Sequence, residues 1–288
     1  MRKRLLTATL GALLAFGGVA KAQDPSASDA SDPNTGALSI AGGIDITTHY
    51  FFRGYLQEDQ GLILQPYGTL YITAHEADNF KVTPYVGIWN SWHDEKTGSD
   101  GTHNQSWYEA DILGGVDVAM GDFTVGLIYT HYTYPNGALE DIGELGLKLA
   151  WNDASVTKES GGLPFQFSPY VAVYFETADD SGTEDTYLEV GIGPSFALGD
   201  TGWTLGVPVV VGMSLDDYYF DENGDEEFLG YGSIGVTLTV PLPMPERYGA
   251  WNLVAGVSYL HLFADTLETI NNDDDGEIIG KLGLAFSY

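Results

Sequence analysis

The sequence predicts an all-β fold: a closed antiparallel transmembrane β-barrel of about 12 strands, with short periplasmic turns and longer acidic extracellular loops. Three observations predict it. Apolar residues alternate with polar or small ones through many segments, the connections between these segments alternate between long and short, and the chain ends in the amphipathic, aromatic segment KLGLAFSY. A two-residue period is the signature of strands with one apolar face.

The alternation returns along the whole chain after Gly36. From Trp107 to Met120, for example, Ala110 and Ile112 fall on one side, and Glu109 and Asp111 on the other. The segments are about 10 to 15 residues long, which exceeds the usual strand of a soluble sheet and suits a tilted membrane strand. The expected strands are 38–52, 62–75, 80–93, 106–120, 122–134, 142–151, 164–177, 185–198, 202–214, 227–242, 250–263 and 277–288.

The connections give an independent test. The odd-numbered joins are long and several are acidic, as in 53–61, 94–105 and 264–276. The even-numbered joins are mostly shorter, as in 76–79 and 199–201, and 152–163 is the exception. An even number of strands with loops of unequal length at its two ends is typical of outer-membrane barrels and puts both termini in the periplasm.

The two ends of the chain agree with export to an outer membrane. Residues 1–22 carry Arg2, Lys3 and Arg4, an apolar run and Ala20-Lys21-Ala22, which is the order of a signal peptide that is removed; a membrane anchor is the alternative. Residues 23–36 are rich in Ser, Asp and Pro, which predicts a disordered periplasmic leader, or else a plug that folds back into a pore. Residues 37–288 are expected to form the barrel. The last segment places Leu282, Leu284, Phe286 and Tyr288 on one face, which resembles the signal read by the barrel-assembly machinery. The expected location is the cell outer membrane of a Gram-negative-type bacterium.

The composition excludes several other classes. The chain has 41 acidic and 11 basic residues and no cysteine. This charge repels nucleic acid, and the fold needs no disulfide. A soluble β-sandwich also has alternating strands. In lipid, however, unpaired backbone groups force a sheet to close, and the signal peptide, strand length, loop asymmetry and terminal aromatic together favour the barrel.

If the apolar faces meet lipid, the opposite faces line the lumen. Carboxylates in excess would favour cations there, and about 12 strands imply a narrow pore at most. The charges could instead pair with one another and fill the interior. The expected lumen or constriction residues are Asp45, Arg53, Tyr67, Tyr71, Trp89, Glu109, Asp111, Glu144, Lys148 and Glu189.

Arg53, Glu109 and Asp111 are the best candidates for a constriction. In HYFFRGYLQEDQG, Phe52 would end the lipid-facing row and Gly54 would start the first external loop. Aromatic belts are expected at both membrane interfaces. The outer belt would contain Tyr50, Phe52, Trp92, Tyr108 and Tyr132, and the periplasmic belt Phe80, Phe123, Trp151, Phe165, Trp203 and Trp251.

No catalytic, cofactor-binding or specific metal site is predicted, and the chain is not expected to be an enzyme. It lacks GxSxG and P-loop motifs, and Thr133 stands where a barrel phospholipase would have serine. The acidic runs 221–225 and 271–275 miss the calcium-loop pattern, the first in the place of its Gly and the second at the terminal Glu. They predict loose association with divalent cations only.

With the barrel expected, the first segment becomes recognisable. THYFFRGYLQEDQG resembles the first strand and loop of the TorF family of outer-membrane porins through Tyr50, Phe52, Arg53, Gly54 and Gln57, whereas Thr48, Leu56 and Glu58 depart from the family's serines. The segment YVGIWNSW matches through Gly87, Trp89 and Ser91, and WYEADILGGV through Glu109 and Asp111. The likeness covers about the first third of the mature chain, and it implies a porin-like protein of unassigned solute.

The expected function is therefore a porin-like outer-membrane channel for passive diffusion of small polar or cationic solutes. The alternative is a structural or surface-interaction barrel with a plugged lumen and no transport role. The expected partners are outer-membrane lipid, small-molecule solutes and the barrel-assembly machinery.

Overall fold

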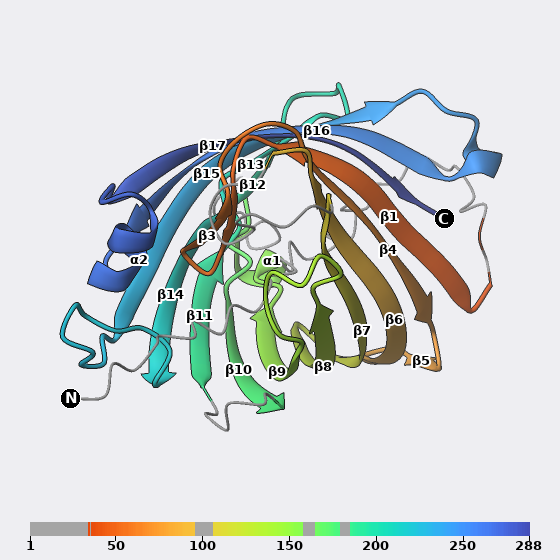
Figure 1. Ribbon diagram of the computed structural model, residues 1–288. Coiled ribbons are helices and arrows are strands. Elements are labelled where there is room, and N and C mark those ends of the chain that lie inside the picture. Colours follow the sequence, from red (N-terminus) through yellow and green to blue (C-terminus); the bar gives the residue numbers. More distant parts are fainter. Residues whose placement is uncertain (1–33, 35, 96–105, 158–164, 179–184) are drawn as a thin grey trace.

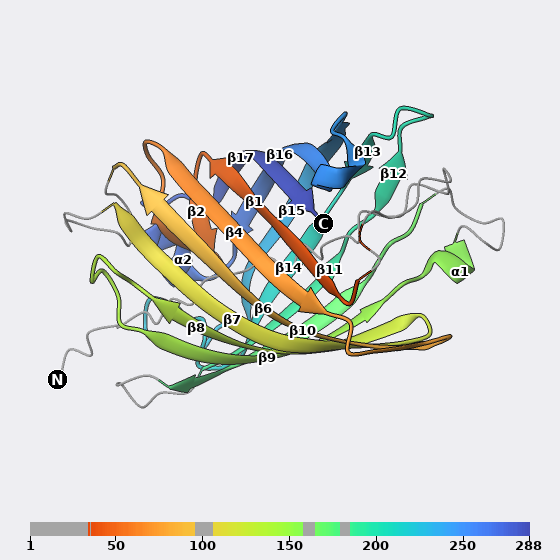
Figure 2. The same ribbon diagram turned by 90° about the vertical axis from the view of Figure 1, so that its right-hand side faces the viewer.

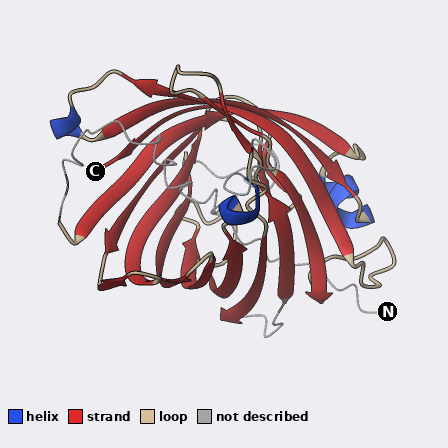
Figure 3. Ribbon diagram, turned by 180° about the vertical axis from the view of Figure 1, so that it is seen from behind, coloured by secondary structure: helices blue, strands red, loops and turns tan. Residues whose placement is uncertain are grey.

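A wall of antiparallel strands closes around the interior of the molecule (Figures 1 and 3). The computed structural model describes residues 34, 36–95, 106–157, 165–178 and 185–288. The expected signal peptide, and all of the expected leader except residues 34 and 36, lie outside the described residues. The wall strands are β1 (Leu38–Thr47), β4 (Ile63–Ile72), β5 (His75–Ala77), β6 (Phe80–His93), β7 (Trp107–Met120), β8 (Phe123–Thr133), β9 (Ile142–Trp151), β10 (Tyr170–Ala178), β11 (Thr186–Ile192), β12 (Ser195–Ala197), β13 (Thr204–Gly206), β14 (Val209–Asp216), β15 (Leu229–Leu242), β16 (Ala250–Leu262) and β17 (Gly276–Ser287).

These segments occupy twelve positions around the barrel, as expected. Each position pairs with its neighbours in the chain, and β1 closes the ring on β17, with Ile44 opposite Leu284. Three positions each consist of two strands: β4 with β5, β11 with β12, and β13 with β14. Pro194 and Pro208 lie at the last two interruptions, where proline removes a ladder donor.

The two faces of the wall differ as the alternation predicts. On β7, Ile112 is 60% exposed on the outside, whereas Glu109 and Asp111 are each 1% exposed on the inside. The same contrast separates outward Leu127 and Tyr129 from inward Ile128 and Thr130 on β8. An apolar outer face with a polar, tyrosine-rich inner face is the reverse of a soluble sandwich.

The first expected strand is shorter than predicted, because β1 ends at Thr47 rather than continuing to residue 52. The chain then forms a separate two-stranded hairpin, β2 (Tyr50–Phe52) and β3 (Tyr55–Glu58), which belongs to no wall strand. The hairpin lies inside the barrel, near the end that carries α2 (Asp265–Ile270) (Figures 1 and 2). The prediction that Phe52 ends a lipid-facing row is therefore wrong.

The short turns lie together at the opposite end of the barrel, where β1 starts and β17 ends. There, the Ile40 N–H donates to the Tyr288 carbonyl, which ties the start of β1 to the end of the chain. The same end holds α1 (Ala154–Thr157) and the 3₁₀ turn Glu246–Tyr248. Within the described residues, no helix has the length and apolar character needed to cross a membrane.

Candidate functional site

The candidate site is the hairpin formed by β2 and β3 together with the wall residues that hold it. Arg53 and Gly54 make its two-residue turn, and both have positive φ, 46° and 90°. Positive φ at both central residues is the geometry of a type I′ turn, whose twist matches a hairpin. For an L-residue such as arginine this conformation costs about 1 to 2 kcal/mol, so other contacts must offset it.

The main offsetting contact is an ion pair with the wall. Arg53 Nη1 and Nη2 donate to the two carboxylate oxygens of Glu144 on β9, at 2.7 and 2.9 Å. Nη1 also donates to the Tyr218 hydroxyl at 3.2 Å. Both side chains of the ion pair are buried. Two parallel N–H···O bonds give the strongest form of this pairing, and they fix the direction of the guanidinium.

Aromatic rings enclose the same guanidinium. The Arg53 Cζ lies 4.1 Å from the Tyr187 ring centroid, 4.5 Å from that of Tyr174 and 4.8 Å from that of Phe52. In a desolvated position such cation–π contacts are worth about 2 kcal/mol. The hydroxyl of Tyr132 donates to Glu144 Oε1 at 2.9 Å, which satisfies the carboxylate further. Carboxylate and rings together replace the hydration of the two terminal nitrogens, whereas the buried Arg53 Nε has no hydrogen-bond partner among the described residues.

The strands on either side of the turn are also tied to the interior. Tyr50 donates to Glu109 Oε2 at 2.9 Å, Tyr55 donates to the Tyr218 carbonyl at 2.9 Å, and Tyr219 donates to the Arg53 carbonyl at 2.9 Å. Tyr218 and Tyr219 belong to the connection after β14, so a second loop folds inward over the hairpin. Burial raises the pKa of the Tyr218 and Tyr219 hydroxyls, which keeps both in the protonated form.

A serine–histidine–glutamate cluster fastens β3 to β6. Ser91 Oγ lies 2.8 Å from His93 Nε2, and His93 Nδ1 lies 3.9 Å from Glu58 Oε2. These are the residue types of a hydrolase triad. All three are fully covered, however, and Glu58 Oε1 accepts the backbone N–H groups of Asp59 and Gln60. In this arrangement the cluster anchors the hairpin and leaves the serine out of reach of a substrate.

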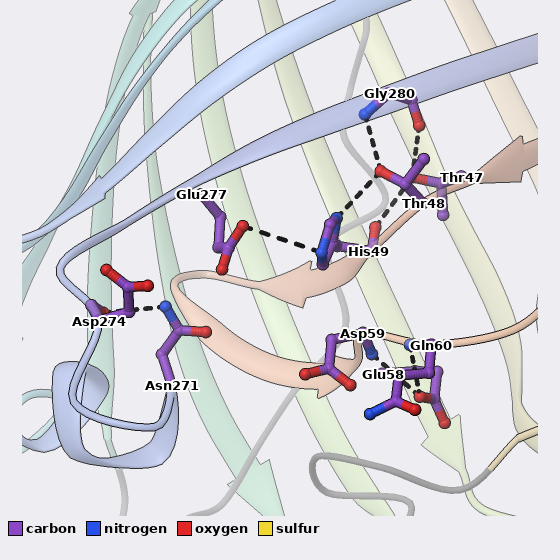
Figure 4. Close-up of polar contacts among 10 residues, drawn as sticks. All are labelled: Thr47, Thr48, His49, Glu58, Asp59, Gln60, Asn271, Asp274, Glu277 and Gly280. Carbon is purple, nitrogen blue, oxygen red and sulfur yellow. Dashed lines mark hydrogen bonds and ion pairs between the residues drawn. The ribbon is translucent and has the colours of Figure 1, made fainter.

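The root of the hairpin is joined to β17 (Figure 4). His49 Nε2 lies 3.8 Å from Glu277 Oε2, and the Gly280 N–H donates to Thr48 Oγ1 at 2.9 Å. At the turn, Gly54 sits so close to α2 that a Cβ there would lie 2.7 Å from Leu267 Cδ1. The hairpin is thus held at its root, along both strands and at its turn.

The structure brings five of the ten predicted lumen residues together around this hairpin: Arg53, Trp89, Glu109, Asp111 and Glu144. The Trp89 ring packs 5.5 Å from that of Tyr50. Arg53 pairs with Glu144 rather than with Glu109 or Asp111. Among the described residues, Arg53 is the only lysine or arginine that is buried, whereas several carboxylates are.

The other five predicted residues lie away from the turn. Glu189 accepts hydrogen bonds from the Tyr170 and Tyr187 hydroxyls at 2.7 and 3.0 Å. Lys148 Nζ lies 4.0 Å from the Tyr170 ring centroid, and Asp45 pairs with Lys281 at 3.3 Å. Tyr67 and Tyr71 are half-buried further along β4, towards the short-turn end.

The predicted members of the outer aromatic belt are largely wrong. Tyr50, Phe52, Tyr108 and Tyr132 are buried inside, whereas Trp92 and Trp107 are exposed. Tyr50 and Phe52 belong to the hairpin. Tyr108 is the extra residue of a β-bulge, where Ser91 pairs with Glu109 but Trp92 pairs with Trp107, and this shift exchanges the faces. Tyr132 lies directly opposite inward Asp111.

The periplasmic belt agrees better with the prediction. Phe80, Phe123 and Trp203 are exposed, and Phe123 stacks on Trp151. Sequence reasoning missed Tyr50, Glu58, Ser91, His93 and Tyr218 as hairpin contacts. The available signal for the turn was Gly54, which adopts positive φ readily and follows Arg53 and an aromatic run.

Beyond the buried Tyr218 and Tyr219, residues 221–226 of the acidic loop form a compact, largely exposed turn. The side chain of Asn223 and the backbone N–H groups of Asn223 and Asp225 donate to the Asp221 carboxylate, and these hydrogen bonds lower the pKa of Asp221. In the described ranges, no three His, Cys, Asp or Glu side chains are grouped as metal ligands.

Solved structures with a similar fold include an outer-membrane channel and a porin. The crystal structure of the COG4313 outer membrane channel from Pseudomonas putida F1 aligns at a TM-score of 0.50 and 8% identity, covering 87% of this chain and 94% of that chain. The NanC porin aligns at 0.41 and 14%, covering 87% and 99%. The translocator domain of autotransporter NalP from Neisseria meningitidis aligns at 0.40 and 15%, covering 88% and 89%. The first of these likenesses supports the barrel fold alone.

No curated protein sequence matches the chain. A family model described as "Bacterial protein of unknown function (Gcw_chp)" matches residues 30–241, which is most of the chain. The chain therefore belongs to the Gcw_chp family of bacterial proteins.

Proposed function

We propose that the protein is a porin-like, non-enzymatic channel in the cell outer membrane of a Gram-negative-type bacterium, and that small polar or cationic solutes diffuse through it. The observation that carries the proposal is the closed barrel with an apolar outside and a carboxylate-rich inside. Such a surface fits lipid on its outer face and water or solute on its inner face. The resemblance of residues 48–61 to the TorF family of porins supports the same function.

The proposed constriction lies at the hairpin. Arg53, Glu109, Asp111 and Glu144 bring one cation and three carboxylates to one level of the barrel, so a passing solute would meet net negative charge. Rings of carboxylates favour cations over anions. Glu189 and Lys148 would continue the polar lining on the neighbouring wall, and Asp45, Tyr67 and Tyr71 would line the side of the interior that leads to the short turns.

Export and assembly complete the proposal. Residues 1–22 would direct the chain through the inner membrane and be removed, and the segment ending at Tyr288 would be read by the barrel-assembly machinery. Phe286 within this segment stacks on Trp251 at 5.2 Å between ring centroids. The acidic external loops would gather divalent cations loosely.

A second function is favoured by the hairpin itself. Its turn and both strands are buried among wall residues, so the barrel could be a structural or surface-interaction protein with a plugged lumen. Planar-bilayer conductance of the purified protein separates the two functions. The channel proposal expects discrete current steps, and their absence at every salt concentration would favour the plugged barrel.

Ion selectivity tests the constriction. Replacing Arg53 with Ala removes the one buried lysine or arginine of the described residues, so we expect the reversal potential in a salt gradient to shift towards stronger cation preference. Lys81→Ala is the matched control, because Lys81 pairs with Glu76 near a short turn, away from the hairpin. If R53A and the wild type have the same reversal potential, Arg53 does not line the conduction path.

A further inference from the structure

The carboxylates of Glu109 and Asp111 stand out among the buried charges. They are two residues apart on β7, so both point into the barrel, and each is 1% exposed. Both oxygens of Asp111 and Oε1 of Glu109 accept no hydrogen bond from the described residues. Only Glu109 Oε2 has a donor, the Tyr50 hydroxyl.

Among the described residues, the nearby polar groups are committed to other partners. Arg53, the buried cation nearby, donates through both terminal nitrogens to Glu144. Tyr132, which stands opposite Asp111 on β8, gives its hydroxyl to Glu144 as well. On the other side Asp111 is opposite Trp89, whose ring packs against Tyr50. Within the part of the chain that the structure describes, the pair is thus surrounded by aromatic rings and has no lysine or arginine partner.

A buried carboxylate without a partner is costly, by several kcal/mol for each ion. The same interior shows how a cation is accommodated, because Arg53 is held between a carboxylate and aromatic faces. Glu109 and Asp111 offer the carboxylate half of such a site, with three free oxygens and two negative charges. Hard divalent cations prefer oxygen ligands and would balance both charges at once.

We propose that Glu109 and Asp111 bind a divalent cation of the calcium type inside the barrel. The two carboxylates supply the charged ligands, and hydroxyl groups or water complete the coordination shell. The inference rests on the proposed channel function for its meaning, since an ion held at this level would set which solutes pass. It also gives the Tyr50–Glu109 contact a second role, because the hairpin then closes over the ion.

Calcium binding to the full-length protein in detergent micelles tests the site. Equilibrium dialysis with radioactive calcium, at mildly alkaline pH and constant ionic strength, should show one saturable site per barrel. Asp111→Asn preserves the shape and removes one charged ligand, so we expect binding weaker by at least about tenfold. The double variant D221N/D225N is the matched control, because it removes the same charge type from the exposed loop and should leave the saturable site intact.

Thermal unfolding of the same proteins provides a readout that does not depend on ligand binding alone. In chelator, D111N should melt at a higher temperature than the wild type, because it removes an unpaired buried charge. Calcium should then raise the melting temperature of the wild type and of D221N/D225N, but not that of D111N.

Two results would overturn the site. The first is that the wild type binds no calcium, which would mean that protons neutralise the pair, or that D221N/D225N loses all of the calcium binding, which would mean that the loop holds the ion. The other is D111N that binds calcium as tightly as the wild type. Because neither measurement uses conductance, a barrel that binds calcium but passes no current would end the channel proposal and leave the site standing.

Discussion

Arg53 combines an unfavourable backbone conformation with a buried charge, and both are stabilised by groups far away in the sequence. Its left-handed φ allows the tight turn, and its guanidinium reaches Glu144, which is 91 residues further along the chain. The sequence indicated that Arg53 faces inward with carboxylates near it. It could not indicate which carboxylate, because all three candidates occupy inward positions, Glu109 and Asp111 on β7 and Glu144 on β9.

The ion pair predicts a large effect of a small change. Glu144→Gln keeps the shape but leaves the guanidinium buried without a charged partner, so we expect a loss of about 3 to 5 kcal/mol in the free energy of unfolding. Urea unfolding of the refolded barrel measures it. Glu76→Gln, at the exposed Lys81–Glu76 pair, should change stability by less than about 1 kcal/mol. Equal effects of the two substitutions would contradict a structural role for the buried pair.

Gly54 tests the packing of the turn. Gly54→Ala should destabilise the protein because Ala is strained at φ 90° and its Cβ would meet Leu267 of α2. Gly137→Ala is the control, since Gly137 also has positive φ, 74°, but has open space around it. We expect the loss in unfolding free energy to be larger at Gly54 than at Gly137. An equal loss at both positions would mean that the turn is not packed against α2.

At the scale of elements, the twelve wall positions could be predicted because each strand repeats its own local period. The hairpin β2–β3 could not be predicted in this way. The run from Ile44 to Phe52 continues the alternation, so its period gives no sign that the chain leaves the wall at Thr47. Tertiary contacts end the strand. Thr48 Oγ1 accepts a hydrogen bond from β17, and the Tyr50 hydroxyl donates to Glu109 inside the barrel.

Hydrogen exchange tests how the hairpin is held. In the wild type the amides of residues 50–58 should exchange slowly although they are not part of the wall sheet, because the hairpin is buried on all sides inside the barrel. In Glu144→Gln we expect the exchange of this segment to increase by a larger factor than the exchange of β6. The measurement is mass spectrometry of peptides from the labelled protein. Rapid exchange of residues 50–58 in the wild type would show that the hairpin is not fastened.

At the scale of the whole molecule, the direction of the apolar face decides the environment. Alternation alone does not distinguish an apolar core from an apolar exterior, but the joint evidence of strand length, loops and chain ends predicted the exterior correctly. The bulge in β7 limited the prediction, since one extra residue exchanged the faces of Trp107 and Tyr108. Belt residues near strand ends are therefore harder to place than those at mid-strand.

Lipid contact predicts a position-dependent cost of charge. Ile112→Lys, at mid-strand on the outer face, should lower the stability of the barrel in lipid vesicles by about 2 to 4 kcal/mol. Ile278→Lys, close to the start of β17 at the long loops, should lower this stability by about 0 to 1 kcal/mol. Both isoleucines are exposed, so in a protein surrounded by water neither change would matter. Two small effects in vesicles would argue against membrane insertion.

The central claim is that the barrel conducts and that the inward hairpin narrows it. The most direct measurement compares single-channel currents of the wild type with those of a variant in which residues 50–58 are replaced by a short Gly-Ser linker. Both proteins are first shown to be folded by heat-dependent migration on SDS gels. We predict small steps for the wild type and steps several times larger for the variant. Folded proteins that both pass no current above background would contradict the claim.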